Sequence, residues 1–213
     1  QLISLGRGLV REDVAAVLMD EPLTVIDPDL KFRLRRNLKE INEQYKTTLV
    51  YVTHDQNEAM TFADNIIVMS EGEVVQTGSP KDLFERPNTT FVGYFIGSPA
   101  MNLFESEVAS ETEVKVGDIK IKTNTNLSKV KNKNIKLGIR SEFIDLADKE
   151  GNNTVKAKVQ KVEDFGNFKL LTATMKNFTI KSKIEREKPI SNDEVNLYIP
   201  AEKCCVYEDE KLI

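Results

Sequence analysis

Residues 14–22 read Val-Ala-Ala-Val-Leu-Met-Asp-Glu-Pro, an apolar run that ends in two adjacent carboxylates, Asp20 and Glu21. A short continuous apolar run of this kind is typical of a strand that is buried on both faces. Carboxylates at the end of such a strand need hydrogen bonds or a metal ion to offset the loss of water. The carboxyl ends of parallel strands are also where α/β sheets bind ligands. The stretch therefore predicts a ligand site at Asp20 and Glu21, although a strand that simply stops at a charged turn would read the same way.

The residues that follow predict a helix and a second strand. From Pro28 to Tyr45, apolar side chains recur every three to four residues, at Leu30, Leu34, Leu38 and Ile41. This spacing is one face of a helix, and Pro28 suits its first turn. Thr48–Thr53 is another apolar, strand-forming run. A strand, a helix and a strand in this order, with both strands apolar throughout, predict an α/β fold with a parallel sheet covered by helices.

Two further polar residues lie at predicted turns beside this sheet. His54, the only histidine in the chain, directly follows the second strand. A histidine at a strand end can donate a hydrogen bond to a phosphate oxygen, but it can equally be an ordinary residue near a helix start. Asp27 precedes Pro28, so it can cap the helix, and it can also reach a neighbouring site. These two interpretations of Asp27 are compatible.

In the rest of the chain, the predicted elements change from a mixture of helices and strands to mainly strands. Gly72 predicts a turn between strands at 66–69 and 73–77. Short helices are predicted at 80–84, with Ser79 as candidate N-cap, and at 90–96. After about residue 100, many short strand-like segments alternate with turn residues, which predicts a small all-β domain, a barrel or a sandwich. We therefore expect two domains, residues 1–98 and residues 99–213, with the boundary near Ser98–Asn102.

Composition limits the possible partners. The net charge of −4 argues against nucleic acid as a partner, because no broad basic surface is implied. Cys204 and Cys205 are adjacent, so they cannot form an ordinary disulfide, and idle thiols in a reducing compartment are expected. The longest apolar run is far too short to span a membrane. Because the chain begins with Gln1, we expect it to be a piece of a longer polypeptide.

The residues taken together resemble the second half of an ABC-transporter ATP-binding subunit. Residues 14–22 are similar to the Walker B strand, residues 23–27 stand at the D-loop, and residues 51–55 are similar to the switch-histidine segment. Residues 83–87 and 91–97 resemble the segment that ends the ATPase domain in importers of the maltose and glycerol-phosphate type. Residues 137–142 and 162–166 resemble elements of the TOBE regulatory domain. The resemblance implies part of a P-loop NTPase, α/β, followed by a small all-β, OB-like TOBE domain.

The resemblance also implies roles, cofactors and partners. Asp20 would bind the cofactor by holding Mg²⁺ through water, Glu21 and His54 would be catalytic, and Asp27 would couple two ATP sites across a dimer. The cofactors would be ATP and Mg²⁺. The partners would be transmembrane permease subunits, a second ATPase subunit and, indirectly, an extracellular solute-binding protein. The protein would lie on the cytoplasmic face of the membrane and power the import of a sugar, a polyol or glycerol phosphate.

The chain departs from the family pattern at its most important loop. The Walker A sequence G-x-x-x-x-G-K-S/T, whose backbone amides and lysine hold the phosphates, does not occur in it. The Q-loop and the signature sequence are absent as well. We therefore expect the isolated chain to be inactive and to expose apolar strand faces, which would favour aggregation. Two alternatives stay open: a non-catalytic dimerisation or regulatory module, and the ATPase of a polyamine, iron or anion importer.

Overall fold

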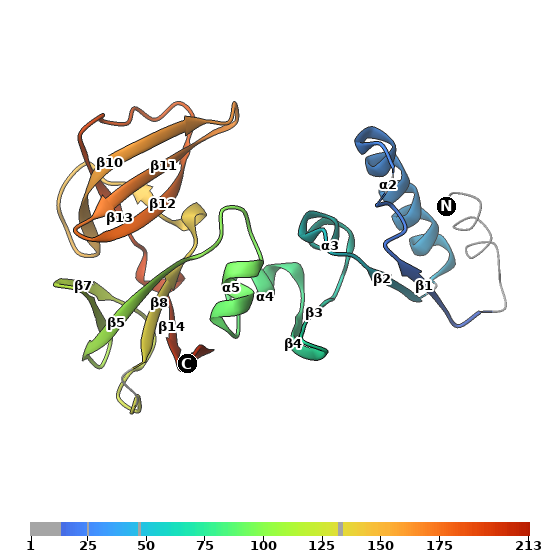
Figure 1. Ribbon diagram of the computed structural model, residues 1–213, viewed down its shortest axis with the longest axis horizontal. Helices are drawn as coiled ribbons and strands as arrows, with labels where there is room; N and C mark the ends of the chain where they lie inside the picture. Colours follow the sequence, from blue (N-terminus) through green and yellow to red (C-terminus); the bar gives the residue numbers. More distant parts are fainter. Residues whose placement is uncertain (1–13, 25, 47, 132–133) are drawn as a thin grey trace. The chain divides into compact units, whose positions relative to one another are not determined.

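The computed structural model describes residues 14–24, 26–46, 48–131 and 134–213 (Figure 1). Contacts divide the chain into two units, residues 1–66 and residues 67–213, and each is described by itself below. The domain boundary expected from sequence near Ser98–Asn102 stays a prediction. No helix in the described parts of the chain is long and apolar enough to cross a membrane.

The first unit contains the predicted parallel β-α-β arrangement. Strand β1 (Ala16–Asp20) pairs in parallel with β2 (Thr48–Val52), in a register that runs from Ala16 opposite Thr48 to Asp20 opposite Val52. Helix α2 (Pro28–Tyr45) connects them, with the bounds that the apolar spacing predicted. Helix α3 (Gln56–Phe62) follows β2. Because the two strands are parallel, their carboxyl ends lie side by side.

The two faces of the β1–β2 sheet differ in exposure. Side chains alternate between faces along a strand, and Met19 is buried on the face that it shares with Leu49 and Tyr51. On the opposite face, Leu18 is 77% exposed and Val50 is 45% exposed. In the described part of the chain, this second face of the sheet is therefore largely uncovered. The expected exposure of apolar strand faces is confirmed here.

The second unit opens with a hairpin and two short helices. Strand β3 (Ile66–Ser70) and β4 (Glu73–Gly78) form a two-stranded sheet. Their two connecting residues have φ of 52° and 82°, the left-handed conformations that a tight hairpin turn requires, and Gly72 adopts its φ at no steric cost. Helices α4 (Pro80–Glu85) and α5 (Thr90–Phe95) follow. Ser79 caps α4 in a reciprocal capping box with Asp82, as its position before Pro80 predicted.

The remainder of the second unit is all β, as predicted. A six-stranded sheet has the order β15-β14-β8-β5-β6-β7, and a five-stranded sheet has the order β12-β11-β10-β13-β9. The first comprises β5 (Asn102–Ser110), β6 (Glu113–Val116), β7 (Ile119–Lys122), β8 (Ile135–Ile139), β14 (Cys205–Glu208) and β15 (Lys211–Leu212). The second comprises β9 (Asp145–Leu146), β10 (Thr154–Asp164), β11 (Phe168–Met175), β12 (Phe178–Glu185) and β13 (Glu194–Tyr198). Two 3₁₀ turns, Ser141–Phe143 and Ala201–Lys203, complete it.

One hydrophobic core joins the two sheets. It contains fully buried side chains from both, including Leu137 of β8, Leu171 of β11 and Leu197 of β13. Cys204 and Cys205 are buried free thiols, and burial raises the pKa of Cys204 to about 12. A thiol with so high a pKa is a poor nucleophile at neutral pH, which agrees with the expectation of idle cysteines.

A single arginine ties α4 and α5 to this β structure. Arg140 follows β8 and is fully buried. Its Nε donates to the carbonyl of Phe84 at 2.9 Å, and its Nη1 donates to the carbonyl of Gly93 at 2.8 Å and to that of Ile96. The guanidinium also lies 4.6 Å from the centre of the Phe84 ring. Arg140 thus supplies donors to three carbonyls at and beyond the helix ends, where backbone oxygens lack helical partners.

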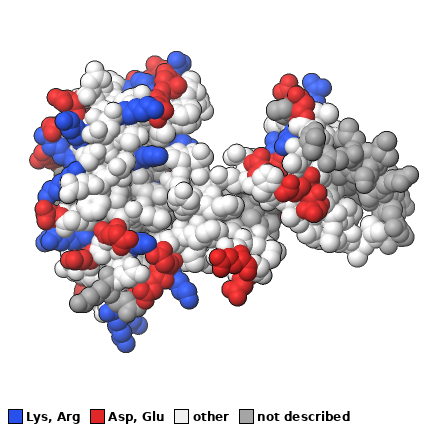
Figure 2. All heavy atoms as spheres, in the orientation of Figure 1, with Lys and Arg blue, Asp and Glu red and all other residues white. Residues whose placement is uncertain are grey.

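The surface of the second unit carries charges of both signs. Figure 2 shows lysines and arginines interspersed with aspartates and glutamates on the visible face. Several form ion pairs, such as Lys176 with Asp118 at 2.6 Å and Lys183 with Glu142 at 2.7 Å. These pairs locally neutralise the surface, in keeping with the small net charge.

Candidate functional site

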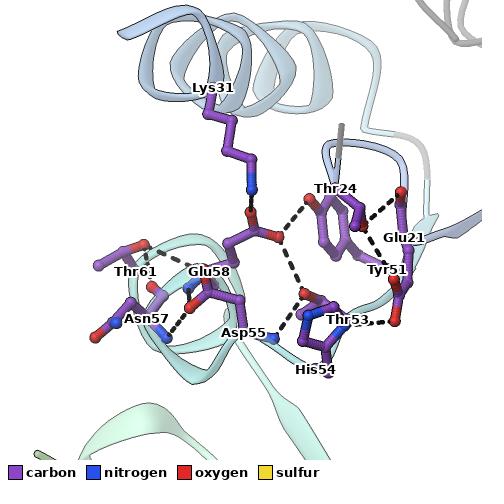
Figure 3. Close-up of polar contacts among 10 residues, drawn as sticks. All are labelled: Glu21, Thr24, Lys31, Tyr51, Thr53, His54, Asp55, Asn57, Glu58 and Thr61. Atoms are coloured by element: carbon purple, nitrogen blue, oxygen red, sulfur yellow. Dashed lines mark hydrogen bonds and ion pairs between the residues drawn. The ribbon is translucent and has the colours of Figure 1, made fainter. Parts of the chain in front are cut away.

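The candidate site lies at the carboxyl ends of β1 and β2 (Figure 3). Asp20 is the last residue of β1 and lies opposite Val52, the last residue of β2. The backbone N–H of Glu21 donates to the carbonyl of Val52 at 2.9 Å, so the pairing continues one residue beyond the strands. This backbone contact brings Glu21, which follows β1, next to His54, which follows β2.

Glu21 and His54 contact each other directly. His54 Nδ1 lies 2.6 Å from Glu21 Oε1, although 33 positions separate the two residues in sequence. Thr24 Oγ1 donates to Glu21 Oε2 at 3.0 Å, so both carboxylate oxygens are held. Glu21 has φ of 43°, a conformation that costs free energy for a residue other than glycine and that is concentrated at functional sites. The glutamate is therefore fixed by its backbone and by two side chains.

The pair shifts the protonation of both members in opposite directions. The hydrogen bond from His54, followed by that from Thr24, lowers the pKa of Glu21. The hydrogen bond to Glu21, followed by the charge of that carboxylate, raises the pKa of His54. Both side chains reach solvent, with 71% of His54 and 40% of Glu21 exposed. The contact therefore favours an ionised carboxylate beside a protonated imidazole, within reach of a ligand.

We expect the His54 signal to report this contact directly in a pH titration. The pKa of His54 is raised above its unfolded value of 6.5. The stabilisation from the pair is therefore complete below pH 6.5 on this side, and it is lost as pH rises through the folded pKa of His54. At the acid end it is lost as Glu21 is protonated below 4.5. Because His54 is the only histidine, its imidazole resonance can be followed without assignment. Glu21→Gln should return the His54 midpoint towards 6.5, and equal midpoints in both proteins would contradict the contact.

Asp20 can serve as a single carboxylate for a metal ion. It is exposed at the end of β1. Among the described residues there is no group of three or more histidine, cysteine, aspartate or glutamate side chains that could hold a metal. Mg²⁺ fits a position of this kind, because it retains several waters and takes one or two protein carboxylates together with substrate phosphates. The role of Asp20 in holding Mg²⁺ through water stays a prediction.

Asp27 acts as a helix cap. Its Oδ1 accepts from the backbone N–H of Asp29 at 3.0 Å, and its carbonyl accepts from Lys31 N at 2.8 Å. This confirms the first of the two interpretations from sequence. Its participation in a nucleotide site across a dimer stays a prediction.

Glu58 is a buried acidic residue near His54 whose burial was not predicted from the sequence. Glu58, in the first turn of α3, is 3% exposed and is contacted by Lys31, Tyr51 and Thr53. The sequence does show that Tyr51 and Thr53, two residues apart, share a face of β2 and its continuation. Nothing in the sequence, however, indicated that Glu58 would be buried against them.

Comparisons with known proteins give one family match and several similar curated proteins. Residues 97–144 match the OB fold domain of MalK. The oligosaccharides import ATP-binding protein MsmX of Bacillus subtilis is 34% identical over 99% of the chain and 60% of its own length. The trehalose/maltose import ATP-binding protein MalK of Thermococcus litoralis is 34% identical over 98% of the chain and 59% of its own length. The sn-glycerol-3-phosphate import ATP-binding protein UgpC of Escherichia coli is 42% identical over 69% of the chain and 42% of its own length.

A solved structure of the molybdate-binding protein ModG aligns with half of the chain at 12% identity and a TM-score of 0.36. The chain spans about half the length of the curated relatives that it matches, between 42% and 60% for these three.

These matches define the class that the chain resembles over nearly its whole length: the import ATP-binding proteins. Within that class, its similarity is to the members named for sugars and for glycerol phosphate, and its second unit contains the OB-fold domain of the MalK type. The resemblance drawn from the Walker B, switch-histidine and TOBE segments is thereby confirmed. Of the fold expected, the β-rich character and the OB-fold domain are confirmed.

Proposed function

We propose that this chain is the part of an ATP-hydrolysing import subunit that carries the metal carboxylate, the catalytic carboxylate and the switch histidine. The observation that carries the proposal is the 2.6 Å contact between Glu21 and His54 at the neighbouring ends of two parallel strands. In this proposal the β1-α2-β2 unit is part of a P-loop NTPase domain, residues 1–98. Residues 99–213 form the regulatory and dimerisation domain.

Each side chain has a role that its geometry supports. Ionised Glu21 can orient a water molecule or accept its proton, because an ionised carboxylate offers two acceptor oxygens. Protonated His54 donates from both ring nitrogens, so Nδ1 serves Glu21 while Nε2 can donate to a phosphate oxygen. Mg²⁺ held through water by Asp20 would supply positive charge to the phosphates of ATP. Asp27, the cap of α2, would couple two such sites.

Partners and substrate follow from the same proposal. Relatives named for import of oligosaccharides, trehalose or maltose, and glycerol 3-phosphate support a sugar, polyol or glycerol phosphate as the transported solute. The subunit would work as a pair, bind transmembrane permease subunits, serve an extracellular solute-binding protein indirectly, and lie on the cytoplasmic face of the membrane. Polyamine, iron or anion import is the alternative within the same class.

The 213-residue chain by itself is expected to show no ATP turnover. It has no G-x-x-x-x-G-K-S/T sequence, and positioning and clamping of the phosphates supply most of the catalysis in phosphoryl transfer. The purified chain with ATP and Mg²⁺ should release phosphate at the same rate as its Glu21→Gln variant. A higher rate that Glu21→Gln removes would show that the chain hydrolyses ATP without that loop.

The positive test joins the chain to the remaining part of a relative. The matching region of Bacillus subtilis MsmX would be replaced by residues 1–213, and ATP hydrolysis and ATP binding would be measured. We expect both. A chimera that is folded and binds ATP but never hydrolyses it would favour the alternative, a non-catalytic dimerisation or regulatory module.

A further inference from the structure

Glu58 is an acidic side chain that is almost fully buried beside the proposed catalytic pair, at 3% exposure. We propose that Glu58 is a positioning residue: it holds the end of β2 so that the His54 imidazole meets the Glu21 carboxylate. This inference rests on the proposed function for its catalytic meaning. The positioning itself is a statement about geometry, and it can be tested without ATP.

The Glu58 carboxylate is held by three donors from two other elements (Figure 3). Its Oε2 accepts from the Tyr51 hydroxyl at 2.9 Å and from the Thr53 hydroxyl at 3.0 Å. Its Oε1 lies 3.3 Å from Lys31 Nζ, which α2 supplies. Burial, followed by the hydrogen bond to Glu58, raises the pKa of Tyr51, so the phenol remains a donor at neutral pH. One carboxylate therefore connects the end of β2 to helices α2 and α3.

These bonds hold the backbone on each side of His54. Thr53, the residue before it, donates its hydroxyl to Glu58 and accepts from the backbone N–H of Asp55 at 3.0 Å. Asp55, the residue after it, caps α3 by accepting from Asn57 N at 2.9 Å and Glu58 N at 3.4 Å. His54 is thus flanked by two anchored residues while its own ring is largely exposed.

The direction of the His54 side chain follows from this anchoring. Successive side chains of an extended segment point to opposite sides, so a Thr53 side chain that is fixed against Glu58 directs His54 away from the helices. Figure 3 shows the imidazole contacting Glu21, whereas the Glu58 carboxylate is contacted by Thr53. An exposed side chain without such support would sample several rotamers. Glu58 thus favours the one arrangement in which Nδ1 reaches Glu21.

The test uses the single histidine as a spectroscopic reporter. In the ¹⁵N-labelled 213-residue chain, long-range ¹H–¹⁵N spectra of the imidazole report whether Nδ1 is hydrogen-bonded. Glu58→Ala should lower the ratio of Glu21-bonded to free imidazole about tenfold, the loss typical of hydrogen bonds to a charged group. Glu58→Gln keeps an acceptor towards Tyr51 and Thr53, so it should retain most of the wild-type signal. Glu40→Gln, on the exposed surface of α2, is the matched control and should change nothing.

A second variant keeps the test decisive if Glu58→Ala does not fold. Thr53→Val preserves the volume and removes only the hydroxyl bridge, so it should shift the imidazole signal in the same direction by a smaller amount. An unchanged His54 signal in a folded Glu58→Ala chain, or in Thr53→Val where Glu58→Ala is unfolded, would overturn the positioning role. Neither result depends on ATP hydrolysis. A chimera without turnover would therefore count against the proposed function alone.

Discussion

Glu21→Gln is expected to lower the steady-state ATP turnover of the MsmX chimera by about 10²–10³, the range typical of losing a general base or one preorganised group. The substitution keeps the size of the side chain and its ability to accept from Thr24 through one oxygen. It removes the negative charge that orients or deprotonates water. ATP binding should be retained, because the phosphates are held elsewhere. Phosphate release and nucleotide binding, measured on the same preparation, separate the two effects.

The control for this prediction should share the backbone conformation of Glu21. Glu71, in the β3–β4 turn, has φ of 52° against 43° for Glu21, and it is exposed. Glu71→Gln should leave turnover unchanged, since no part of the proposed site includes it. If Glu21→Gln and Glu71→Gln turn over ATP at equal rates, Glu21 is not the catalytic carboxylate, and the roles given to Asp20 and His54 lose their support.

Arg140→Met is expected to destabilise the second unit by about 2–4 kcal/mol, because it removes a buried donor from backbone carbonyls. The methionine fills much of the volume but removes the side-chain donor of the Phe84 and Ile96 carbonyls, whereas the Gly93 carbonyl keeps the N–H of Met101 at 3.2 Å. Buried polar groups without partners cost about 1–3 kcal/mol each. For a unit of this size we expect the midpoint of thermal unfolding to fall by roughly 10 °C. Circular dichroism can follow it, because the unit is rich in strands.

Two further variants separate the geometry of Arg140 from its charge. Arg140→Lys keeps the charge but cannot present a planar fork to three carbonyls, so it should be intermediate. Arg186→Met removes an arginine that is half exposed and pairs with Asp164 at 3.5 Å, and it should cost about 0–1 kcal/mol. A loss for Arg140→Met no greater than that for Arg186→Met would contradict the anchoring role of Arg140.

Local patterns predicted the elements of this chain well. The helix at Pro28–Tyr45, the cap at Ser79 and the β-rich second half follow from residue spacing and capping chemistry, which depend on neighbours within a few positions. The parallel pairing of β1 and β2 followed from two apolar runs joined by a helix. Because the carboxyl ends of parallel strands meet, the same pattern predicts that Asp20, Glu21 and His54 lie at one edge of the sheet.

Local sequence patterns did not predict which charged side chains are buried by distant segments. Glu58 looks like any acidic residue in the first turn of a helix, and Arg140 like any arginine after a strand. Their burial depends on groups from 5 to 56 positions away in sequence. The sequence also did not distinguish the covered face of β1 and β2 from the uncovered one, because both strands are apolar throughout.

The sequence by itself determined which elements form, which strand ends carry the carboxylates and the histidine, and which class of protein the chain resembles. Only the tertiary structure decided that Glu58 supports His54, that Arg140 holds the ends of α4 and α5, and that Leu18 and Val50 are exposed. The physical reason is the range of the interactions. Periodicity and capping depend on neighbouring residues, whereas the burial of a charged side chain depends on donors and acceptors that distant segments supply.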